Sequence, residues 1–135
     1  MRQNYTQLYA HCVWATWERM PLIVPDLQMP IYRAITAECR KLGCDALAIG
    51  GISDHIHLLI SFPPSLAISS LMKQIKGSSS HLVTHQLNPG EFFKWQGGYS
   101  AFTLSSKDLD AIKAYIKNQA SHHRKKQVVP DWELL

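Results

Sequence analysis

The sequence has little cysteine and no long apolar run. Its three cysteines, Cys12, Cys39 and Cys44, form no Cys-x-x-Cys pair, which argues against a disulfide framework and a cysteine-based structural zinc site. No apolar stretch approaches the roughly 20 residues that a membrane span requires, and the first residues do not resemble a secretory signal. We therefore expect a cytoplasmic protein with reduced thiols and no part in the membrane.

A strong excess of charge is also missing. Lys and Arg number 14 and Asp and Glu number 10, so the formal net charge is only +4. This balance allows a nucleic-acid partner but does not require one. Internal repeats and low-complexity tracts are absent as well, and 46% of the 135 residues are hydrophobic. The composition predicts one compact domain over residues 1–135 with a buried core.

Alternating and helical apolar patterns predict seven elements. Strands are expected at residues 5–17, 45–52, 55–62 and 99–104, and helices at 26–42, 65–87 and 107–125. The first six elements have the order of the ferredoxin-like (RRM-like) split β-α-β fold, an α+β fold with a four-stranded antiparallel sheet and two helices on one face. The C-terminal helix is an addition that is free to cover the other face or to reach a neighbouring subunit.

Two histidines, His55 and His57, stand two positions apart in the third predicted strand. Residues i and i+2 of a strand point to the same face, so the two imidazoles would lie side by side on a stiff platform. Such a pair can hold a metal ion, although the pattern also fits one core histidine and one exposed histidine. Leu59 excludes a His-x-His-x-His hydrolase, and the paired H-x-S/T motifs of a two-histidine phosphoesterase are missing. The aromatic motif of an RNA-binding sheet is missing too.

Tyr115 and Gln119 lie four residues apart in the last predicted helix and therefore share a face. Viewed alone, such a tyrosine also fits a half-buried aromatic residue. Combined with the histidine pair, the Gln119 amide oxygen would complete a three-point site that can hold a divalent cation against a phosphate oxygen. The tyrosine would face that phosphate, and metal charge and nearby lysines would favour its phenolate form. Attack on a phosphodiester would conserve the bond energy, as strand transfer requires.

Four segments in order along the chain carry a family resemblance. They read DHIHLL at 54–59, LMKQIKGSSS at 71–80, FKWQGGYSAF at 93–102 and YIKNQ at 115–119. Together they resemble the small single-tyrosine transposases of the HUH (His-hydrophobic-His) endonuclease superfamily, in the insertion-sequence 200/605 group. The resemblance covers nearly the whole chain.

The resemblance implies a DNA transposase that cleaves and rejoins single-stranded DNA through a covalent 5′-phosphotyrosine intermediate and so mobilises an insertion sequence. Tyr115 would be the nucleophile, and His55, His57 and Gln119 would hold Mg²⁺ or Mn²⁺. The implied partners are DNA hairpins at the element ends and a second copy of the chain, with no nucleotide cofactor. Whether the histidines and the tyrosine of one site belong to the same subunit is left open.

Several positions carry weaker expectations. The helix lysines and one arginine could contact phosphates, and these are Lys73, Lys76, Lys113, Lys117 and Arg124. Tyr99 and Trp95 fit either base stacking or packing, and Asp54 is interpreted as a turn residue rather than a support for a histidine. Gly98 and the tail at 127–133 depart from the family pattern, so the role of the tail is open. The alternative function is a domesticated or non-catalytic relative that binds single-stranded DNA or hairpins.

Overall fold

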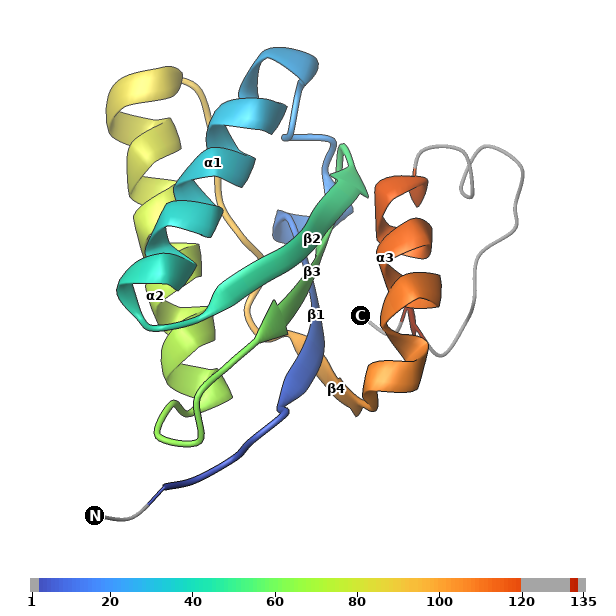
Figure 1. Ribbon diagram of the computed structural model, residues 1–135. Helices are drawn as coiled ribbons and strands as arrows, with labels where there is room; N and C mark the ends of the chain where they lie inside the picture. The colour runs from blue at the N-terminus through green and yellow to red at the C-terminus, as the bar shows by residue number, and fades with distance from the viewer. Residues whose placement is uncertain (1–2, 120–131, 134–135) are drawn as a thin grey trace.

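The computed structural model describes residues 3–119, 132 and 133, and it has the expected ferredoxin-like arrangement (Figure 1). The strands are β1 (Tyr9–Ala15), β2 (Asp45–Ile52), β3 (His55–Ser61) and β4 (Ser100–Leu104). The helices are α1 (Pro25–Lys41), α2 (Ile68–Leu82), which continues into a π-helical turn at Val83–Leu87, and α3 (Leu109–Lys117). The sheet is antiparallel throughout, in the order β2-β3-β1-β4. None of the described helices is long and apolar enough to cross a bilayer.

The element bounds agree with the sequence patterns to different degrees. The strand predicted at 45–52 coincides with β2, whereas β1 begins four residues later than expected and gives way to a 3₁₀ turn at Trp17–Arg19. The second helix is shorter at its start because Pro63 and Pro64 are followed by turn residues before Ile68. The last helix was predicted at 107–125, but α3 begins at Leu109 and ends at Lys117, where Asn118 leaves the helical conformation. Residues 120–125 of that prediction lie outside the described residues.

The face of the sheet toward α1 and α2 holds the larger apolar core. Trp14 and Leu58 from the central strands are fully buried there, against Ile35 of α1 and Ile75 of α2. Each such side chain contributes about 1.5–3 kcal/mol by leaving water. This face therefore supplies most of the apolar burial that holds the four strands together.

The opposite face is covered by α3, as Figure 1 shows. Its core is small and contains Ala48, Leu59, Ile112 and Ile116. The helix can approach β2 closely because position 50 is Gly50, where an added Cβ would lie 2.3 Å from the carbonyl oxygen of Ile116. A glycine in a strand often marks such a close backbone approach. The missing Cβ at Gly50 thus allows α3 to pack closely on the face that carries the histidine pair.

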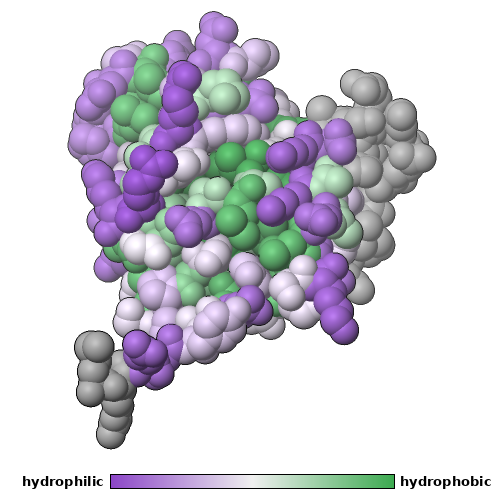
Figure 2. Space-filling view, in the orientation of Figure 1, coloured by the Kyte–Doolittle hydropathy of each residue, from purple (hydrophilic) through white to green (hydrophobic). Residues whose placement is uncertain are grey.

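Strand β2 forms one edge of the sheet, since it pairs with β3 on one side only among the described strands. Leu47, Ile49 and Ile52 on this strand are only partly buried. Figure 2 shows apolar surface over β2, between α1 and α3. An exposed apolar edge strand is a surface that natural proteins usually cover.

Candidate active site

His55 and His57 lie at the start of β3, with both side chains fully buried on the face under α3. Their neighbours on β1 in the strand pairing are Ala15 and Val13. The two imidazole rings are 5.0 Å apart between centroids and meet edge to face. The expectation that the His-x-His spacing puts both rings on one side of a strand therefore matches the geometry.

An acidic side chain holds His55 from behind. Asp54 Oδ1 lies 2.7 Å from His55 Nδ1, and Arg19 pairs with the same carboxylate at 3.3 Å. Burial lowers the pKa of His55, but the carboxylates of Asp54 and Glu133 outweigh burial and leave that pKa above its ordinary value. The interpretation of Asp54 as a turn residue was incomplete, because its side chain orients a histidine. Carboxylates behind histidines are the usual support of metal-ligating imidazoles.

A third histidine, His11 on β1, holds His57 in the same way. His11 Nε2 lies 2.8 Å from His57 Nδ1, and both residues are buried. Burial, followed by the neighbouring charge of His57, lowers the pKa of His11 to about 4. His11 is therefore neutral near pH 7 and can share one proton with His57 Nδ1. The sequence alone assigns His11 no role, because its contact with His57, 46 residues away, follows only from the strand register.

Tyr115 and Gln119 reach this pair from α3 and the turn after it. The Tyr115 ring lies 5.9 Å from the His57 ring and is 5% exposed. Gln119 Oε1 lies 3.2 Å from His55 Nε2. The structure thus brings together all four residues of the expected tyrosine and metal site, and it does so within one chain.

The tail adds two residues that the sequence analysis left without a role. Glu133 Oε2 lies 2.9 Å from His57 Nε2, and Glu133 Oε1 lies 3.7 Å from His55 Nε2. Trp132 meets the Tyr115 ring edge to face at 4.9 Å. Burial raises the pKa of Glu133, but the two histidines outweigh it and hold the pKa well below its usual range. The carboxylate is therefore ionised at neutral pH and faces the Nε2 atoms of both imidazoles.

Comparison with known proteins identifies the family. A family model described as "Transposase IS200 like" matches residues 4–119. The chain belongs to the IS200-like transposases. It is 36% identical over 114 residues to the transposase for insertion sequence element IS200 of Salmonella typhimurium. The aligned region covers 81% of this chain and 74% of that protein. It is 25% identical over 120 residues to the ISDra2 transposase TnpA of Deinococcus radiodurans, with 84% of each chain covered.

Solved structures agree with this assignment. A crystal structure of a putative transposase from Deinococcus radiodurans superposes with a TM-score of 0.68 at 25% identity, over 88% of this chain and 95% of that one. A REP-associated tyrosine transposase bound to a REP hairpin superposes with a TM-score of 0.65 at 20% identity, over 91% of this chain and 73% of that one. The second likeness shows the fold, which confirms the ferredoxin-like prediction.

The donor atoms of this IS200-like transposase fit a divalent metal ion. One ligand atom each from His55, His57 and Glu133 lies within 4.8 Å of the others. Both imidazoles are supported through Nδ1, by Asp54 and by His11, so that Nε2 of each faces the carboxylate. Two imidazoles and a carboxylate, with an amide oxygen from Gln119 beside them, form a donor set suited to a divalent cation. Imidazole is a better ligand for Mn²⁺ than for Mg²⁺, which prefers oxygen atoms.

The basic residues expected to touch DNA do not form one group in this transposase. Lys73 and Lys76 lie on α2, whereas Lys113 and Lys117 lie on α3, across the sheet (Figure 1). Lys73 and Lys117 are exposed, and Arg124 lies outside the described residues. Lys76 donates hydrogen bonds to the carbonyl oxygens of Gln96 and Gly98, and burial lowers its pKa. Lys76 therefore has a structural partner in the chain.

Proposed function

We propose that this transposase cleaves and rejoins single-stranded DNA with Tyr115 as its nucleophile. The observation that carries the proposal is the packing of the Tyr115 ring against His57, 5.9 Å away, in a chain of the IS200-like family. A phenol buried beside two imidazoles and an ionised carboxylate is an unusual core arrangement. It is the arrangement that a tyrosine nucleophile and its electrophilic site require.

We further propose that His55, His57 and Glu133 hold the divalent ion, with Gln119 as an additional oxygen ligand. When bound, the ion would supply positive charge to a phosphate oxygen and to the leaving oxygen. His11 and Asp54 would keep the two imidazoles in the tautomer that presents Nε2. Their contacts at 2.8 Å and 2.7 Å support this role.

The strand-transfer step balances without a nucleotide cofactor. The Tyr115 hydroxyl oxygen attacks phosphorus and loses its proton, and the P–O3′ bond breaks. The released O3′ takes up a proton, and the 5′ phosphate remains on the tyrosine as a phosphodiester. A second 3′ hydroxyl reverses the step and rejoins the strand. Because one phosphodiester replaces another, the reaction needs no external energy source.

The substrate would be single-stranded DNA that carries hairpins near the element ends. The net charge of +4 and the exposed Lys73 and Lys117 support binding to a polyanion. The fold neighbour described as bound to a REP hairpin supports the same class of substrate. We also propose a homodimer that covers the apolar edge at β2, where Leu47, Ile49 and Ile52 are only partly buried.

The test is covalent trapping. Wild-type protein incubated with Mn²⁺ and single-stranded DNA from its own element ends is expected to form an adduct that survives denaturing electrophoresis. Tyr115→Phe should form none, while keeping the melting temperature and DNA affinity of the wild type. Tyr9→Phe, on β1 away from the site, is the matched control and should form the adduct normally. An adduct from the Tyr115→Phe chain would disprove the assignment of the nucleophile.

The position of Tyr115 beside His57 of its own chain also predicts an active site in cis. In a mixture of the two variants, the His57→Ala subunits keep the tyrosine and the Tyr115→Phe subunits keep both histidines. An intact tyrosine can then meet an intact histidine pair only in another chain. A cis site should therefore leave the mixture as inactive as either variant alone. Recovery toward one quarter to one half of the wild-type adduct yield after subunit exchange would instead establish a site shared between two chains.

A further inference from the structure

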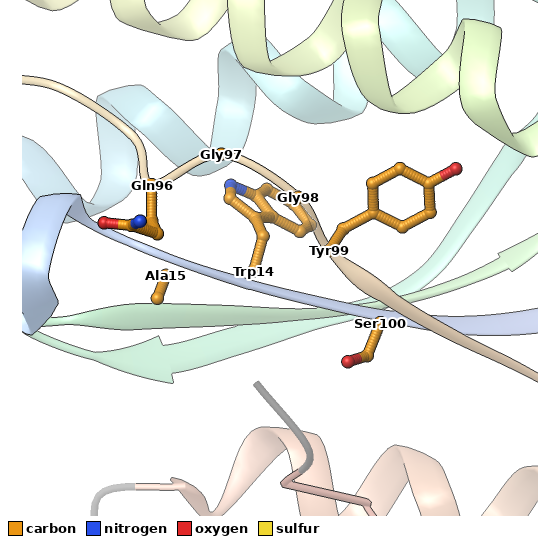
Figure 3. A pocket seen from close by; sticks show the side chains of 7 residues that line it. All are labelled: Trp14, Ala15, Gln96, Gly97, Gly98, Tyr99 and Ser100. Carbon is orange, nitrogen blue, oxygen red and sulfur yellow. The ribbon is translucent and has the colours of Figure 1, made fainter.

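A pocket of about 260 Å³ lies beside β1 and the start of β4, with Trp14 and Tyr99 on the face of the sheet away from α3 (Figure 3). Its lining comes from Trp14 and Ala15 of β1 and from the segment 96–100 that leads into β4 (Figure 3). Pockets for drug-sized molecules are usually larger, about 300–1,000 Å³. This volume suits a single planar ring system rather than an extended ligand.

The floor of the pocket carries an unused hydrogen-bond donor. Trp14 is fully buried, and its indole Nε1 has no hydrogen-bond partner among the described residues. The neighbouring indole of Trp95, 5.9 Å away, instead donates to Ser79 Oγ at 3.0 Å. In Figure 3 the Trp14 nitrogen points toward the Gln96–Gly97 side of the pocket. A buried donor without a partner costs about 1–3 kcal/mol, so a ligand acceptor at this point would be stabilising.

The wall of the pocket is held in place before any ligand arrives. Lys76 of α2 donates to the carbonyl oxygens of Gln96 and Gly98, at 2.7 Å and 2.9 Å. On the other side, the Gln96 backbone N–H donates to Ala15, and Gln96 Oε1 accepts from the backbone of Glu18. Binding into a wall that is already fixed loses little conformational entropy.

The mouth of the pocket presents an aromatic ring. Tyr99 is 40% exposed although it is a large apolar side chain, and it stands beside Trp14 in Figure 3. The next residue, Ser100, points to the opposite face, toward α3 (Figure 3). Ser100 pairs with Val13, which in turn pairs with His57. The pocket and the histidine pair therefore lie at the same level along the strands, on either side of the edge at β4.

We propose that this pocket binds one unpaired nucleobase of the DNA, stacked on Tyr99 and hydrogen-bonded by the Trp14 indole N–H, while the strand passes the edge at β4 toward Tyr115. The DNA as ligand rests on the proposed function. A base offers both a flat face and the ring nitrogen or carbonyl acceptor that the indole requires. A base stacked in a duplex does not expose its flat face, so the pocket selects an unpaired one.

The first test is binding by fluorescence anisotropy, with a labelled mixed-sequence single strand of about 20 nucleotides and its duplex as probes. Tyr99→Ala is expected to weaken single-strand binding about 5- to 100-fold, the range for loss of one base–aromatic stack. Trp14→Phe keeps the ring and removes the N–H, and should weaken binding a few-fold. Phe92→Ala, which removes another exposed aromatic outside the pocket lining, is the matched control and should change nothing. Duplex binding should be the same for all variants.

The second test uses a single strand with 5-iodouracil at successive positions, cross-linked by light and mapped by mass spectrometry. Cross-links at Tyr99 or Trp14 are expected from the wild type. Cross-links confined to other peptides, or unchanged single-strand affinity in Tyr99→Ala, would overturn the proposal. Tyr99→Ala decides the question even if Trp14→Phe fails to fold.

Both tests are repeated on the Tyr115→Phe chain, so they do not depend on cleavage. Wild-type protein that forms no adduct but cross-links at Tyr99 would refute the proposed chemistry and keep the base pocket. If wild-type protein forms the adduct while Tyr99→Ala binds the single strand as tightly as wild type, the proposed chemistry stands and the base pocket is refuted.

Discussion

The two faces of the sheet bury different kinds of side chain. The face under α1 and α2 is closed by large apolar residues such as Trp14 and Leu58. The face under α3 has a core of four buried apolar residues and buries His11, His55 and His57 beside it. Buried polar groups stabilise a fold less than well-packed apolar groups do. We infer that the first face holds the fold together, whereas the second keeps reactive groups in place and can be altered without unfolding the sheet.

The largest expected effect on the α3 face comes from Gly50→Ala. The new Cβ would lie 2.3 Å from the carbonyl oxygen of Ile116, and a backbone atom cannot move aside as a flexible side chain can. We expect a loss of about 3 kcal/mol in the free energy of unfolding, at the upper end of overpacking effects. Displacement of α3 should also reduce adduct formation at least tenfold. Denaturant titration and the trapping assay measure the two effects.

Gly77→Ala in α2 is the matched control for that substitution. A Cβ at Gly77 meets nothing within 4 Å, and alanine is the better helix former. The free energy of unfolding should therefore rise by about 0.5–1 kcal/mol. If Gly50→Ala lowered neither the free energy of unfolding nor adduct formation, the close approach of α3 to β2 would not be the feature that positions Tyr115.

The fold and the center of the site were predictable from the sequence because both depend on local periodicity. Alternation placed His55 and His57 on one face, and helical spacing placed Gln119 one turn after Tyr115. The roles of His11 and Asp54 were not predictable in this way. His11 reaches His57 only through the register of β1 against β3, and Asp54 turns its side chain back toward the neighbouring ring rather than into the turn.

The tail was the least predictable part of the site. No period in the sequence connects Glu133 to a strand 76 residues earlier, and the resemblance to the family covered the tail poorly. The family model likewise ends at Gln119. Contacts of this kind depend on the path of the chain after the last regular element, so they emerge only from the folded structure.

A smaller effect is expected from Glu133→Gln. The amide removes the negative charge that faces both Nε2 atoms but keeps the shape of the side chain. We expect the affinity for Mn²⁺, measured by electron paramagnetic resonance, to fall at least about tenfold. Metal sites lose about that much affinity even when the substituted residue only supports a ligand through a hydrogen bond. Wild type should bind Mn²⁺ more tightly than Mg²⁺ because two of the proposed ligands are imidazoles.

Glu91→Gln, an exposed loop substitution, controls for the change in net charge and should leave the affinity unaltered. Unchanged Mn²⁺ affinity in Glu133→Gln, together with faster adduct formation, would assign the carboxylate to covering the site instead of holding the ion. Either result separates the contribution of the tail from that of the two histidines.

The smallest effects concern pH, where the two faces should respond in opposite directions. On the α3 face, burial lowers the pKa of His11 from 6.5 to about 4. Between those values the unfolded chain binds more protons, so the free energy of unfolding should fall on acidification. The raised pKa of His55 acts in the opposite direction.

On the α1 and α2 face, burial raises the pKa of the Cys12 thiol from 9.0 to about 12. Between pH 9 and 12 the unfolded chain loses this proton and the folded chain keeps it, so stability should fall as pH rises. Denaturant midpoints across the pH range measure both effects. His11→Gln is expected to reduce the dependence of stability on pH in the acidic range, and Cys12→Ala in the alkaline range. If His11→Gln changed the pH dependence of stability as strongly in the alkaline range as in the acidic range, the two faces would not titrate independently. The sheet would then transmit strain between them, and substitutions at the core face would be expected to change the chemistry at Tyr115.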